Sequence, residues 1–153
     1  MVTVVVPPAA AKVTLAYAGA FLFNILIQVV GKVRSIRAFK ALKAATSTKE
    51  RYNRYTSDVL IAADRSVGNF VEWQGVFLSL FWANALVTGN EIELGYVYVA
   101  IRLLYPILAH AGGVTQAGPR PLIFLATVPG YYVLARYAYL LYQALYPLPC
   151  CHV

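Results

Sequence analysis

The chain is predicted to be an all-α integral membrane protein, a bundle of four membrane-spanning helices. Its 153 residues are 60% hydrophobic and only 12% charged, which exceeds the apolar content typical of a soluble domain of this size. Four apolar runs are each long enough to cross a bilayer, and basic residues gather between the first two. The length allows one membrane domain, covering residues 1–153.

The first predicted span, residues 13–30, is interrupted only by the polar residues Asn24 and Gln28. The second predicted span is residues 59–86. At the helical rise this run measures about 40 Å, so its beginning is expected to project into water.

A tight turn is expected at residues 88–90, where Thr, Gly and Asn follow one another. The third predicted span, residues 92–108, contains Arg102. A Gly- and Pro-rich loop at residues 110–121 is expected to precede the fourth span, residues 122–145.

The charges between spans predict the orientation. Eight basic residues are expected in one loop between the first two spans: Lys32, Arg34, Arg37, Lys40, Lys43, Lys49, Arg51 and Arg54. Such a loop belongs on the cytosolic-equivalent side of the endoplasmic reticulum or another organelle membrane, with both chain ends opposite. A basic segment beside a span also favours anionic membrane lipid over nucleic acid as a partner.

A polar stripe on the second span is the main functional clue. Asp58, Arg65, Asn69 and Glu72 fall within a narrow sector of one helical face. Charges at membrane depth cost on the order of 3 kcal/mol each, so a stripe of them implies packing partners or a ligand. One interpretation is purely structural: Glu72 pairs with Arg102, Asn69 bridges two helices, and nothing binds.

Other chemistries have little support in the sequence. Cys150 and Cys151 are adjacent near the C-terminus, and His110 and His152 have no acidic or sulfur neighbours at ligand spacing, so no metal site is predicted. The tail is expected to be disordered or palmitoylated. The chain has no Walker loop, dinucleotide glycine motif or nucleophile elbow.

The segment RSVGNFVEWQGVFL, residues 65–78, resembles the second-helix signature of the MAPEG superfamily. These are the membrane-associated proteins in eicosanoid and glutathione metabolism. The family pattern is Arg, three residues, Asn, two residues, Glu and an aromatic. Arg65, Asn69, Glu72 and Trp73 match this pattern in register.

The segment AIRLLYPILAH, residues 100–110, resembles the third-helix pattern of the same family, in which Arg and Tyr stand three apart. Arg102 and Tyr105 occupy these positions. The chain departs from the pattern at Ala62, where glutathione-using members often have a basic residue, and at Gly75, where Pro is common.

The resemblance implies a homotrimer that binds glutathione between neighbouring subunits. Arg65 and Arg102 would bind the carboxylates of glutathione, Glu72 its amino group, and Asn69 a further polar group. Tyr105 belongs to the same binding face.

The resemblance also implies contributions from three further arginines. Arg34 or Arg37 would add to the anion site. Arg120 would be the catalytic group that favours the thiolate, although an ordinary interfacial arginine would occupy the same position. The implied activity is glutathione transferase or glutathione-dependent peroxidase on a lipophilic substrate. The alternative is a non-enzymatic relative that binds lipid or packs within a larger membrane complex.

Overall fold

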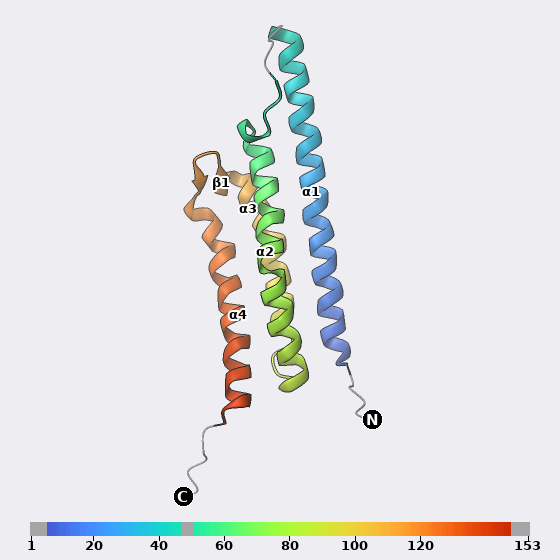
Figure 1. Cartoon of the computed structure of the whole chain (residues 1–153), viewed down its shortest axis with the longest axis vertical. Helices are drawn as coiled ribbons and strands as arrows, with labels where there is room; N and C mark the ends of the chain where they lie inside the picture. The colour runs from blue at the N-terminus through green and yellow to red at the C-terminus, as the bar shows by residue number, and fades with distance from the viewer. Residues whose placement is uncertain (1–5, 47–50, 148–153) are drawn as a thin grey trace, which may run out of the picture.

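The computed structural model describes residues 6–46 and 51–147. It is built from four long helices that run up and down beside one another: α1 (Pro8–Thr46), α2 (Asp58–Val87), α3 (Leu94–Leu108) and α4 (Phe124–Leu145). The all-α prediction is therefore confirmed. Figure 1 shows the beginning of α1 and the end of α4 at one end of the bundle, and a small β-ribbon next to the opposite end of α4.

Within the described residues, three helical segments are long and apolar enough to cross a membrane: Pro8–Thr46, Asp58–Val87 and Leu94–Gly113. This agrees with a membrane protein and with three of the four predicted spans. The helix α4 coincides with the fourth predicted span, but five tyrosines and Arg136 lower its hydropathy. A fourth crossing therefore stays a prediction.

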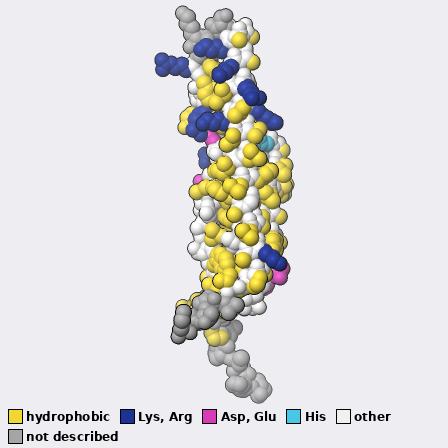
Figure 2. Space-filling view, turned by 90° about the vertical axis from the view of Figure 1, so that its right-hand side faces the viewer, with side chains coloured by type: hydrophobic (Ala, Val, Ile, Leu, Met, Phe, Trp, Pro, Cys, Tyr) yellow, Lys and Arg dark blue, Asp and Glu magenta, His cyan; other side chains and the backbone are white. Residues whose placement is uncertain are grey.

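The first basic segment is helical, which corrects the prediction of a loop after residue 30. The helix α1 continues to Thr46 and carries five of the basic residues: Lys32, Arg34, Arg37, Lys40 and Lys43. Alanine, lysine and arginine are strong helix formers, and no proline follows Gly31 within the helix, so the helix continues past the apolar run. Figure 1 shows α1 projecting beyond its neighbours, and Figure 2 shows Lys and Arg gathered at that end. Lys49 lies outside the described residues.

The predicted loop after α3 also has regular structure. A wide π-helical turn, Ala109–Gly113, ends α3. Strands β1 (Val114–Thr115) and β2 (Gly118–Pro119) then pair antiparallel. Glycine suits two positions here because the φ angles of Gly112 and Gly118 are +93° and +110°.

The turn between α2 and α3 is fixed by side chains, as its Thr-Gly-Asn sequence predicts. The Asn84 amide donates to the Asn90 carbonyl at 2.7 Å, and the Thr88 hydroxyl donates to the Asn84 side-chain oxygen at 2.8 Å. Gly89 has a φ of +66°, in the left-handed region that favours glycine.

The core contains a column of aromatic rings that fixes α3 against α1 and α2. Phe77 and Tyr98 stack with their ring centroids 4.0 Å apart, and Tyr17 packs on Phe77 at 4.9 Å. All three are almost fully buried. This packing places the Tyr98 hydroxyl where it accepts a hydrogen bond from Arg102, a residue of the predicted site.

Cys150, Cys151 and His152 lie outside the described residues.

Candidate functional site

A cavity of about 910 Å³ lies between the first half of α2, the β-ribbon and Tyr105 of α3. Its wall includes three members of the predicted polar stripe, Arg65, Asn69 and Glu72. Together with Tyr105, four of the residues singled out in the sequence line one space. The cavity is within the size range of small-molecule sites.

The beginning of α2 is tied to the β-ribbon that covers one side of the cavity. The Ser57 hydroxyl accepts a hydrogen bond from the Leu60 N–H at 3.4 Å and caps the helix. The Asp58 carboxylate accepts from the Gln116 N–H at 2.9 Å, and the Gln116 amide donates to the Thr56 carbonyl at 2.8 Å. Asp58, the first member of the stripe, therefore has a structural partner.

Arg102 lies in the protein interior, with only 4% of its surface exposed. Its guanidinium donates to the side-chain oxygen of Asn69 and to the hydroxyl of Tyr98, and it lies 4.6 Å from the centroid of the Tyr98 ring. Its Nε has no hydrogen-bond partner. Among the described residues no carboxylate forms an ion pair with Arg102, so its charge is balanced only by neutral dipoles.

The structural interpretation of the stripe is met in part. Asn69 does bridge two helices through Arg102. Glu72, however, is exposed, and neither Glu72 nor Arg65 has an ion-pair or side-chain hydrogen-bond partner in residues 6–46 and 51–147. The cavity wall thus presents a free cation and a free carboxylate 7 positions apart, about 10 Å along the helix axis.

Sequence reasoning missed Asp64 and Arg54, which also line the cavity. They form an ion pair, and the Gln28 amide of α1 donates to the same Asp64 carboxylate at 2.8 Å. The sequence does carry a signal for Asp64, because it is a charged residue inside an apolar stretch. On the helix surface, however, Asp64 lies beside the polar stripe and not within it. This pair fixes the connection before α2 against α1.

The remaining predicted arginines lie elsewhere. Arg34 lines a separate cavity of about 340 Å³ between α1 and α3. Arg37 is exposed on α1 and does not line the α2 cavity. Arg120 is exposed between β2 and α4; its neighbour Pro119 lines the cavity, and its N–H donates to the Gly113 carbonyl at 2.8 Å.

Comparison with known proteins adds no relatives. No family model, no curated protein and no solved structure matches the chain.

Proposed function

We propose that this chain is a MAPEG-type membrane protein that binds glutathione in the α2 cavity and uses it on a lipophilic substrate. The activity is glutathione transfer or glutathione-dependent peroxide reduction, in the membrane of the endoplasmic reticulum or another organelle. The observation that carries the proposal is Arg102, a buried cation beside the cavity with no acidic partner in the described chain.

A buried, unpaired cation is costly unless an anion compensates it. Glutathione offers two carboxylates and one ammonium group. Arg65 and Arg102 suit the carboxylates, and the free carboxylate of Glu72 suits the ammonium group. Asn69 and Tyr105 supply polar atoms beside them. Arg102 does not line the cavity itself, but its guanidinium binds Asn69 of the cavity wall. Arg34 and Arg37 do not line the cavity and have no part in this assignment.

The proposed chemistry needs a thiolate, and Arg120 is the proposed activating group. A guanidinium close to the sulfur lowers the pKa of the thiol. The sulfur then forms a C–S bond with the electrophile, whose leaving group departs with its electron pair. With a hydroperoxide, the thiolate sulfur attacks the terminal oxygen and the O–O bond breaks, so the sulfur becomes a sulfenic acid and the alkoxide takes a proton and leaves as the alcohol. The thiol of a second glutathione then attacks the sulfenic sulfur and releases glutathione disulfide and water. The substrate enters sideways from the bilayer.

Calorimetry with glutathione tests the binding site. Arg65→Ala is expected to weaken binding at least tenfold, about 1.4 kcal/mol. The matched control is Arg51→Ala, an exposed arginine outside the cavity lining, which leaves affinity unchanged. Equal losses in both variants would contradict the assignment. Turnover is then followed with an aryl halide.

The second candidate function is a non-enzymatic subunit that binds lipid or packs within a larger membrane complex. One observation favours it: Arg120, the residue assigned to activate the thiol, is exposed and does not line the cavity. Binding of glutathione without turnover, or no binding by the wild-type protein, would support this function over the first.

A further inference from the structure

A second cavity, of about 340 Å³, lies between α1 and α3 at the end where basic residues gather. Apolar side chains of α1 and α3, together with Val59 of α2, form most of its wall. Several are half exposed: Leu26 59%, Val30 39%, Ile107 58% and Val59 45%. We name this space the α1–α3 groove. It begins at Leu26 and reaches Arg34, eight residues on, or about 12 Å along α1.

The floor of the groove is set by a close helix contact. A Cβ added to Gly31 would lie 3.2 Å from the Cβ of Ala63, so glycine allows α1 and α2 to approach here. Pro106 of α3 lines the opposite side. The groove is therefore a feature of the backbone packing rather than of one flexible side chain.

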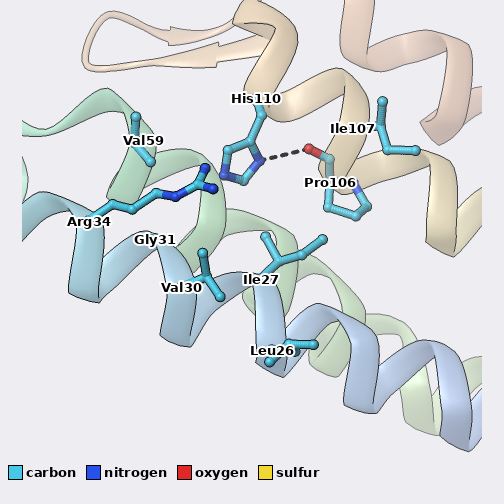
Figure 3. Close-up of a pocket in the computed structure, with 9 residues that line it drawn as sticks. All are labelled: Leu26, Ile27, Val30, Gly31, Arg34, Val59, Pro106, Ile107 and His110. Carbon is cyan, nitrogen blue, oxygen red and sulfur yellow. Dashed lines mark hydrogen bonds between the residues drawn. The ribbon is translucent and has the colours of Figure 1, made fainter.

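Two nitrogen-bearing side chains close one end of the groove. Figure 3 shows the Arg34 side chain extending from α1 toward the ring of His110, which follows α3. The His110 Nδ1 lies 2.8 Å from the Pro106 carbonyl, and it must donate because a carbonyl only accepts. That bond fixes the ring and leaves Nε2, which in the neutral imidazole accepts a hydrogen bond, for another partner. In residues 6–46 and 51–147, Arg34 has no carboxylate partner.

The groove is thus apolar along its length and cationic at its end, the pattern of an amphipathic anion. We propose that the α1–α3 groove binds an anionic phospholipid of the surrounding bilayer, with its phosphate at Arg34, a head-group hydroxyl donating to the His110 Nε2, and one acyl chain along Leu26 and Ile107. Charge complementarity favours this occupant, because basic pockets between helices on the cytosolic side bind anionic head groups. The half-exposed apolar wall gives the chain access from the bilayer. This inference does not depend on the proposed glutathione site.

Native mass spectrometry of the full chain in detergent, doped with phosphatidylglycerol or with phosphatidylcholine, tests the proposal. Arg34→Gln is expected to lower phosphatidylglycerol occupancy at least fivefold. The matched control is Arg37→Gln, because Arg37 is exposed on the same helix but does not line the groove, and it is expected to retain wild-type occupancy. Ile107→Trp fills the groove without changing charge and is also expected to lower occupancy.

Three results would overturn the proposal. Equal losses of phosphatidylglycerol occupancy in Arg34→Gln and Arg37→Gln would mean that the lipid is attracted to the basic surface in general and not to the groove. Full occupancy in Ile107→Trp would mean that no acyl chain lies in the groove. Displacement of the lipid by an equal concentration of glycerol phosphate would mean that the head group binds alone. Arg34 and Ile107 are exposed, so both variants are expected to fold, and matching melting temperatures check this.

Discussion

The side-chain amide of Asn24 in α1 donates to the backbone carbonyl of Arg102 in α3 at a distance of 3.4 Å. The Arg102 carbonyl needs this donor because the residue four positions later is Pro106, which has no N–H to complete the helical hydrogen bond. The same Asn24 amide also donates to the Ala20 carbonyl at 2.9 Å, and the residue is 1% exposed. A polar residue of the first span thus completes the backbone of the third, beside the buried guanidinium.

Replacing Asn24 with leucine is expected to destabilise the protein by about 1 kcal/mol, because the Arg102 carbonyl loses its donor. In a Pro106→Ala background the restored N–H satisfies that carbonyl, so the same Asn24→Leu change is expected to cost less. Thermal unfolding in detergent of the two single variants and the double variant measures the coupling. Additive losses would mean that Asn24 acts through packing alone.

The positions of α2, α3 and α4 follow from apolar runs, which is why the second, third and fourth predicted spans agree with these helices to within about two residues at each end. The exception is α1, whose polar continuation to Thr46 depends on helix propensity and not on hydrophobicity. The partner of Arg102 could not be predicted from the sequence. Glu72 and Asn69 share one face of α2, so their spacing does not distinguish between them. In the structure the guanidinium binds Asn69 and the hydroxyl of Tyr98, whose ring is stacked on Phe77.

Arg102→Lys is expected to weaken glutathione binding at least fivefold although it retains the charge. The planar guanidinium binds Asn69 and Tyr98 simultaneously, and a lysine ammonium cannot reproduce that geometry. Calorimetry checks the affinity, and near-ultraviolet circular dichroism checks that the fold is retained. Unchanged affinity in a folded Arg102→Lys protein would mean that the ligand does not use this arginine.

The turn between α2 and α3 is expected to respond to acid. Glu91 has a φ of +53° and pairs with Arg136 of α4, whose hydrogen bond lowers the pKa of the Glu91 carboxyl below its ordinary value. A lowered pKa in the folded state means that the pair stabilises the protein above the ordinary carboxyl pKa. That stability is lost as the pH falls through the lowered pKa.

Arg136→Gln is therefore expected to lower the melting temperature near neutral pH and to have little effect once the pH has fallen below the lowered pKa and Glu91 is protonated. Melting curves of wild type and variant across this range give the result. A difference that stays constant with pH would show that Arg136 contributes through packing rather than through its charge.

A homotrimer is expected, or at least a bundle whose polar groups are shared between chains. Arg136 does not require a neighbour, because Glu91 of the same chain binds it. Glu72 does, because it is exposed on a helix long enough to span a membrane and a charge facing lipid is costly. Mass spectrometry from mild detergent measures the stoichiometry. A stable monomer that still binds glutathione would contradict this prediction.

Removal of Arg120 is expected to spare glutathione binding but to slow turnover about 10²-fold, the size of effect seen when a charge contact to the transition state is lost. The residue is exposed, directly follows β2 and is next in the chain to Pro119 of the cavity wall, but it does not line the cavity itself. The measurement is kcat against pH for Arg120→Leu, with Arg51→Leu as an exposed control outside the cavity lining. The expected result is a lower kcat and a rate that rises only at higher pH, because the bound thiol then ionises without help. If Arg120→Leu is as active as a robustly active wild type, Arg120 has no part in the mechanism. If the wild-type protein binds glutathione but shows no turnover, the non-enzymatic function is favoured.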